Sequence, residues 1–205
     1  MVWQIETGSQ LLKIWVVANN GGIYFTDPAF RAPMPLPQGK TGVYYLSPEG
    51  KVSRLIDDLP NPNGVILSPD EKTLYINNCY DKESWFPVQS EKDNFIWAYD
   101  VNEDGSVSNG RKFAKVLLNG DVLDRKGRSS GADGMAIDKE GNIYVATYNG
   151  VQIFNNQGGY VGMINLPTFP VSLCFGGDDM KTLFIVSFSK VYKIKTNKEG
   201  YVNYL

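Results

Sequence analysis

The stretch Glu140-Gly-Asn-Ile-Tyr-Val-Ala-Thr147 decides the fold, because three other segments of the chain repeat its pattern. In each copy a turn is followed by a short run rich in Ile, Val, Tyr or Phe, and this arrangement predicts a β-strand. The other copies are Asn20-Gly-Gly-Ile-Tyr-Phe-Thr-Asp27, Glu71-Lys-Thr-Leu-Tyr-Ile-Asn-Asn78 and Met180-Lys-Thr-Leu-Phe-Ile-Val-Ser187. The chain therefore contains a repeated strand.

Each repeated strand is flanked by two further strand-like runs. The preceding runs are Lys13 to Ala18, Gly64 to Ser68, Gly134 to Asp138 and Ser172 to Phe175. The following runs are Gly42 to Gly50, Phe95 to Asp100, Gly150 to Phe154 and Lys190 to Ile194. Units of roughly 40 to 50 residues with three or four strands are typical of propeller blades. We therefore predict an all-β fold, with a partial β-propeller of about four blades over residues 20–205 and a non-matching N-terminal segment over residues 1–19.

The composition excludes several functional classes. The 205 residues include 20 Lys plus Arg and 22 Asp plus Glu, and the two signs are mixed along the chain, so no basic surface for nucleic acid is expected. The chain has no histidine, which excludes a Ser-His-Asp triad, a Cys-His pair and a His-ligated zinc site within it. Any catalysis must use carboxylates, Lys, Tyr or a bound metal.

The cysteines and the N-terminal region give little information about the cellular compartment. Cys79 and Cys174 form no CxxC motif, so they are one disulfide or two buried thiols, and we favour the thiols. The apolar run from Leu11 to Ala18 is too short to span a bilayer, and no basic region of a signal peptide precedes it. We predict a cytoplasmic protein without a membrane partner, although an export signal upstream of this sequence stays open.

Candidate functional residues stand just before the innermost strand of each unit, because these positions converge at one mouth of a propeller channel. Asn63 and Asp133 occupy matching places in two units, each followed by Gly. An amide oxygen and a carboxylate suit Ca²⁺, Mg²⁺ or Mn²⁺ and, with fewer ligands, Zn²⁺. The alternative is that Asn-Gly and Asp-Gly only form turns, as expected at Asp104-Gly105.

Residues from about 20 to 200 resemble the senescence marker protein, gluconolactonase and luciferin-regenerating enzyme family, especially its bacterial lactonases. Several short motifs in a characteristic order carry this resemblance. They are Gly22-Ile-Tyr-Phe-Thr-Asp-Pro28, Leu59-Pro-Asn-Pro-Asn-Gly-Val65, Ser68-Pro-Asp-Glu-Lys-Thr-Leu-Tyr75, Ile96-Trp-Ala-Tyr-Asp-Val101, Gly131-Ala-Asp-Gly-Met-Ala-Ile-Asp138 and Cys174-Phe-Gly-Gly177.

The resemblance implies a six-bladed propeller that holds one divalent cation, with Ca²⁺ expected first and Zn²⁺, Mn²⁺ or Mg²⁺ as alternatives. Asn63 and Asp133 match two of the family's metal ligands, and Asp133 also matches its catalytic base. The implied reaction is hydrolysis of a sugar lactone or related cyclic ester. Ser172 matches a channel position of the family, and Tyr148 follows a central strand, so both are candidate substrate-binding residues; Tyr148 also fits a plain Tyr-Asn-Gly turn.

Two departures from the family pattern lie at the N-terminus. Lys13-Ile14 stand about nine residues before the Gly-Gly of the Ile-Tyr-Phe-Thr strand, where family members usually carry Asn-Asp with the Asn touching substrate. The family's third metal ligand is a Glu of an opening blade that we do not find in this chain, and Glu6 is the only acidic residue before Asp27, in surroundings that do not match. A ring with four blades of six leaves two unpaired edges, so we predict either a homodimer through the open edges or poor behaviour in solution. The alternative function is a non-catalytic propeller that binds a small ligand or a protein. A third hypothesis is a strictosidine-synthase-like propeller.

Overall fold

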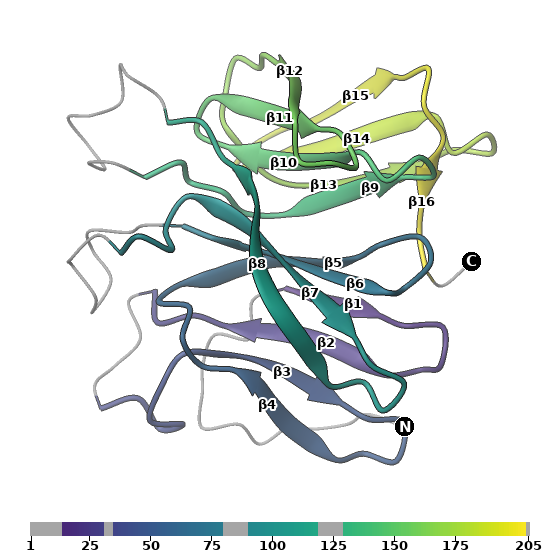
Figure 1. Cartoon of the computed structure of the whole chain (residues 1–205). Helices are drawn as coiled ribbons and strands as arrows, with labels where there is room; N and C mark the ends of the chain where they lie inside the picture. The colour runs from purple at the N-terminus through teal and green to yellow at the C-terminus, as the bar shows by residue number, and fades with distance from the viewer. Residues whose placement is uncertain (1–13, 31–34, 80–89, 119–128, 204–205) are drawn as a thin grey trace.

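The computed structural model describes residues 14–30, 35–79, 90–118 and 129–203, and these ranges contain strands and turns but no helix. The strands form four antiparallel sheets, blades 1 to 4, which lie side by side in chain order (Figure 1). Blade 1 comprises β1 (Trp15–Val17), β2 (Ile23–Asp27), β3 (Gly42–Leu46) and β4 (Val52–Ile56). Blade 2 comprises β5 (Pro62–Leu67), β6 (Thr73–Asn78), β7 (Phe95–Val101) and β8 (Val107–Lys115).

Blade 3 comprises β9 (Met135–Asp138), β10 (Ile143–Thr147), β11 (Gly150–Phe154) and β12 (Tyr160–Ile164), and blade 4 comprises β13 (Pro170–Gly176), β14 (Thr182–Ser187) and β15 (Val191–Lys195). The repeated stretch is the second strand of every blade. The preceding strands β1, β5, β9 and β13 contact one another in sequence, which makes them the inner strands of the array. The predicted all-β propeller with about four blades is confirmed.

Buried apolar side chains fill the spaces between neighbouring blades. Leu74 and Ile76 pack between blades 1 and 2, Ile143 and Phe154 between blades 2 and 3, and Leu183 between blades 3 and 4. Each is at most 1% exposed, and burying a side chain of this size stabilises the fold by roughly 1.5 to 3 kcal/mol. The repeated strand thus supplies the contacts that stack the blades.

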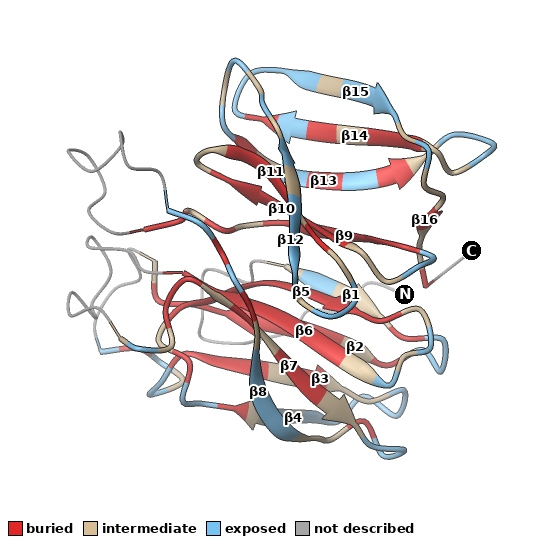
Figure 2. Ribbon diagram, turned by 45° about the horizontal axis from the view of Figure 1, so that its top comes forward, coloured by how far each residue is buried: buried red, intermediate tan, exposed pale blue. Residues whose placement is uncertain are grey.

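Blade 4 ends the array with an uncovered face, visible as the exposed parts of β13, β14 and β15 in Figure 2. Val186 and Val191 are paired across β14 and β15 on this face, and they are 39% and 67% exposed. Within the described residues no fourth strand pairs with β15; instead the final strand, β16 (Gly200–Tyr201), pairs with the inner edge of β9. Dimerisation through open edges stays a prediction.

The structure corrects the expectation for one cysteine. Cys79 is buried and Cys174 is exposed, and the two do not form a disulfide. Cys174 alternates with buried Leu173 and Phe175 along β13, so its side chain lies on the uncovered face of blade 4. In the part of the chain that the structure describes, there is no helix with the length and apolar character needed to cross a membrane.

Candidate functional site

A β-bulge positions Asn63. The register between β5 and β6 shifts after the Pro62–Asn78 pair, so that Asn63 and Gly64 both lie opposite Asn77. Blade 3 repeats this arrangement: Asp133 N donates to Ala146 O, and Ala146 N donates to Gly134 O, each at 3.0 Å. Bulges often re-aim side chains beside functional sites. The matching placement inferred from the sequence therefore has a common structural cause.

Asn63 has a buried oxygen that lacks a hydrogen bond. Its side chain is only 4% exposed, and its Nδ2 donates to Ala132 O at 2.9 Å. Its Oδ1 accepts no hydrogen bond within the described residues. Leaving such a buried acceptor unsatisfied costs roughly 1 to 3 kcal/mol, so Asn63 Oδ1 is suited to a cation or a water molecule.

Asp133 follows directly after the peptide group that Asn63 contacts. Its main-chain oxygen accepts a hydrogen bond from Asn77 Nδ2 at 2.6 Å, and its side chain is partly buried. Asn63 from blade 2 therefore lies against the Ala132–Asp133 segment of blade 3, although Asn63 and Ala132 are 69 residues apart in the chain. The structure brings the two predicted metal ligands into one neighbourhood.

The two candidate substrate-binding residues border the same segment. A Cβ at Gly134 would lie 2.6 Å from Ser172 Oγ, so Ser172 is in close contact with the residue after Asp133. Gly131 has a φ of +61°, and a Cβ there would meet the Tyr148 ring at 2.6 Å. Glycine at position 131 therefore allows both the left-handed backbone and the close approach of Tyr148.

A channel cavity of about 240 Å³ lies between the inner strands of the blades. Ser172 and Gly134 border it near the candidate site, and Asn203 borders it after β16. Cys174 also lines the cavity, and although the residue is exposed, partial burial of its thiol raises the pKa, which disfavours the thiolate needed for nucleophilic attack. Oxygen groups, rather than this thiol, are thus the candidates for chemistry.

The residues near the segment 131–134 fit a cation in part. Asn63 supplies a buried unsatisfied oxygen and Asp133 a carboxylate, both hard ligands of the kind that Ca²⁺ and Mg²⁺ prefer. Among the described residues there is no group of three or more His, Cys, Asp or Glu side chains that could hold a metal ion. Glu6, which the sequence offered as a weak substitute, lies outside the described residues.

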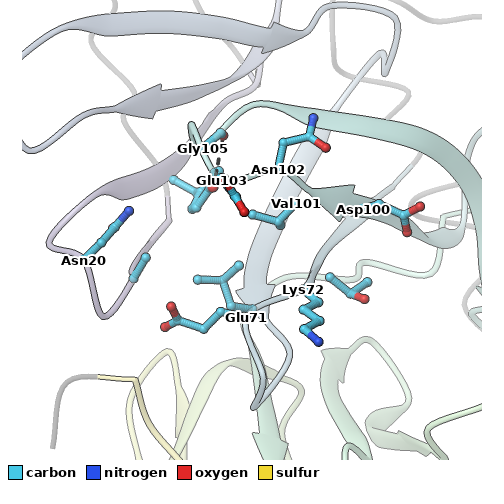
Figure 3. Close-up of a pocket in the computed structure, with 12 residues that line it drawn as sticks. Asn20, Glu71, Lys72, Asp100, Val101, Asn102, Glu103 and Gly105 are labelled. Atoms are coloured by element: carbon cyan, nitrogen blue, oxygen red, sulfur yellow. Dashed lines mark hydrogen bonds between the residues drawn. The ribbon is translucent and has the colours of Figure 1, made fainter.

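A larger hollow of about 540 Å³ lies between blades 1 and 2, at the ends of the inner strands opposite to the candidate site. Figure 3 shows turn residues such as Glu71 and Asn102 around it. Leu67, at the end of β5, borders this hollow, whereas Asn63 lies near the start of β5. Because a strand of six residues spans about 20 Å, the hollow is separate from the candidate site. The Glu71 carboxylate accepts a hydrogen bond from Asn203 Nδ2 at 2.8 Å. Glu71 therefore links the blades to the end of the chain.

Two residues that the sequence analysis did not select also reach the site. Thr26 Oγ1 donates to Asn63 O at 2.6 Å, and Asn77 Oδ1 accepts from Gly64 N at 3.1 Å. Both side chains are fully buried. Aligning the four repeated strands would have revealed them. Both are polar residues at the fourth position of the apolar run, where blades 3 and 4 have the apolar residues Ala146 and Val186.

The fold and site together define a β-propeller whose polar residues gather at the start of the inner strands. The SMP-30/Gluconolactonase/LRE-like family model matches residues 15–189, and the chain belongs to this family. A gluconolactonase of Zymomonas mobilis subsp. mobilis is 32% identical over 200 residues, which cover 89% of this chain and 49% of that protein.

Solved structures give the same result. A gluconolactonase of Xanthomonas campestris is 28% identical with a TM-score of 0.68, over 88% of this chain and 55% of the other. The calcium-binding protein regucalcin of Agrobacterium tumefaciens is 19% identical with a TM-score of 0.70, over 92% and 62% of the two chains, and this likeness shows the fold alone. The chain spans about half, or less, of the length of the curated relatives it matches.

Proposed function

We propose that this chain carries the hydrolytic site of a divalent-metal-dependent lactonase acting on a sugar lactone or a related cyclic ester. One observation carries the proposal: Asn63 has a buried, unsatisfied Oδ1, and its Nδ2 donates to Ala132 O, the residue directly before Asp133 on the neighbouring blade. Family membership and the gluconolactonase names of the relatives support the substrate class.

Asn63 and Asp133 would hold the cation, with Ca²⁺ as the first candidate and Zn²⁺, Mn²⁺ or Mg²⁺ as alternatives. A bound divalent cation supplies electrophilic polarisation of an ester carbonyl and stabilises negative charge on its oxygen. This chemistry needs no imidazole, which agrees with the absence of histidine from the sequence.

In the proposed reaction, the Asp133 carboxylate accepts a proton from the water that attacks the lactone carbonyl carbon. A new C–O bond forms to the water oxygen, and the ring C–O bond then breaks. The departing ring oxygen takes the proton back from Asp133, so that the product is the open hydroxy acid. Tyr148 and Ser172, which border the segment 131–134, would contact the substrate and orient its ring.

The test uses the full 205-residue chain. Calorimetric titration with Ca²⁺, Zn²⁺ and Mn²⁺ is expected to show binding, and aldonolactone hydrolysis followed with a pH indicator is expected to fall at least about 100-fold in Asp133→Asn. Asp104→Asn, in an exposed turn, is the matched control and should retain the parent rate. Equal rates in Asp133→Asn and the parent would refute the proposed base.

The alternative function, a non-catalytic propeller that binds a small ligand or a protein, makes the opposite prediction. No metal binding at millimolar concentration, together with no lactone hydrolysis, would favour this alternative over the enzyme.

A further inference from the structure

We infer that Thr26 and Asn77 are positioning residues, which set the orientation of Asn63 and Asp133 from the neighbouring blade. The expected effect of these residues on metal binding rests on the proposed function. Its structural basis is independent of that function, because it lies in two hydrogen bonds that buried side chains donate from one blade to the next.

The first bond crosses from blade 1 to blade 2. Thr26 in β2 is fully buried, and its hydroxyl donates to the main-chain oxygen of Asn63 at 2.6 Å. A hydrogen bond to this carbonyl restrains the peptide plane that follows Asn63, and so the backbone from which the Asn63 side chain extends to its own bond with Ala132 O. The hydroxyl therefore helps to hold Asn63 Oδ1 in its buried position without a hydrogen-bond partner.

The second bond crosses from blade 2 to blade 3 in the same way. Asn77 in β6 is fully buried, and its Nδ2 donates to the main-chain oxygen of Asp133 at 2.6 Å. Its Oδ1 accepts from Gly64 N at 3.1 Å, so one amide holds the residue after Asn63 and the main chain of Asp133 together. The Asn77 side chain therefore sets the spacing between the two predicted ligands.

Comparison of the four repeated strands shows that these hydrogen-bonding side chains occur only beside the candidate site. Thr26, Asn77, Ala146 and Val186 are equivalent positions of the four repeated strands. Only Thr26 and Asn77 have polar side chains, and only their blades are followed by a blade with a predicted metal ligand near the start of its inner strand. A purely structural requirement of the blade would place a polar donor in every copy, whereas Ala146 and Val186 are apolar.

The buried donors are costly to remove, which gives the test its size. Removing the donor leaves a main-chain carbonyl without its hydrogen bond. Loss of one such bond typically weakens the equilibrium that depends on it, here metal binding, by about fivefold to tenfold. Thr26→Val deletes the hydroxyl with little change of shape, and Asn77→Leu deletes the amide. Thr26→Ser keeps a hydroxyl and serves as the rescue variant.

Two matched controls remove similar bonds away from Asn63 and Asp133. The Thr41 hydroxyl donates to Leu59 O at 3.1 Å, and the Gln152 amide donates to Leu117 O at 2.9 Å. Thr41 is 3% exposed and Gln152 is fully buried, so Thr41→Val and Gln152→Met reproduce the loss of a buried donor. They control for the general destabilisation that each change produces.

The experiment has a metal-binding arm and an arm without metal. In the first, calorimetry with Ca²⁺ or Mn²⁺ alone should show binding weakened at least about fivefold in Thr26→Val and Asn77→Leu, and within twofold of the parent in Thr26→Ser and both controls. In the second, NMR hydrogen exchange of the Asn63 side-chain amide, assigned by its disappearance in Asn63→Asp, should be faster by a similar factor in the same two variants only.

The two arms separate failure of the inference from failure of the proposed function. Parent-like amide exchange and parent-like metal affinity in Thr26→Val and Asn77→Leu, or equal changes in the controls, would overturn the positioning role. A parent chain that binds no metal would overturn the proposed function, and the amide exchange would still decide the positioning role.

Discussion

Gly64 provides the sharpest test of the site geometry, because it lies between Asn77 and Asp133. A Cβ added at Gly64 would lie 2.2 Å from Asp133 O and 2.4 Å from Asn77 Nδ2. A carbon and a carbonyl oxygen normally stay about 3.3 Å or more apart, so Gly64→Ala must displace the Asp133 main chain by about 1 Å. The change therefore separates blades 2 and 3 at the point where Asn63 and Asp133 converge.

The expected size follows from these contacts. Adding a methyl group to a packed interior typically costs about 1 to 3 kcal/mol, and disturbing the Asn77 hydrogen bonds adds about 1 kcal/mol. For a chain of this size, 1 kcal/mol shifts the unfolding midpoint by about 2 to 4 °C. We therefore expect Gly64→Ala to lower Tm by about 5 to 15 °C and to weaken metal binding.

Thermal unfolding followed by circular dichroism, with metal titration on the folded variant, measures both effects. Gly162→Ala is the matched control, because Gly162 lies in β12 with no atom within 4 Å of an added Cβ. The control should change Tm by no more than about 2 °C. A Gly64→Ala variant as stable as Gly162→Ala would refute the close contact between Gly64 and Asp133.

Two further predictions concern acid stability and association. The Ser68 hydroxyl and the Lys72 amide donate to Asp70 and lower the pKa of its carboxyl. The stability from this lowered pKa is present above roughly pH 4, the pKa of unfolded aspartate, and is lost as the pH falls through the lower folded value, so Asp70→Asn should reduce Tm at pH 7 but much less at pH 2.5. Because blade 4 has an open edge, we also expect dimers in gel filtration at low micromolar concentration, and a stable monomer there would contradict this prediction.

Much of the fold could be predicted from local patterns. The repeated strand with its Leu74 or Ile143 and the flanking runs identified all four blades, because an apolar strand bounded by turns reads the same wherever it occurs. The exposure of Cys174 was not predictable in this way. Whether one face of β13 is covered depends on what packs beyond blade 4, which no local pattern records.

The candidate site was predictable only as far as repeat alignment reaches. Asn63 and Asp133 could be selected because they hold equivalent places in two units, but the sequence alone did not distinguish ligands from simple turns. The structure adds the bulges opposite Asn77 and Ala146, and the unsatisfied Asn63 Oδ1 that favours a ligand role. Thr26 and Asn77 were missed because, read singly, a polar residue near a strand end is usually unremarkable.

The sequence by itself determined the strands, their grouping into blades and the residue types available for chemistry, because turn residues and apolar alternation act over a few neighbours. Only the tertiary structure decided which groups face one another across blades: Asn63 against Ala132, Thr26 against Asn63, and Asn77 against Asp133. Such contacts join residues tens of positions apart, and their partners are set by how buried side chains stack one sheet on the next.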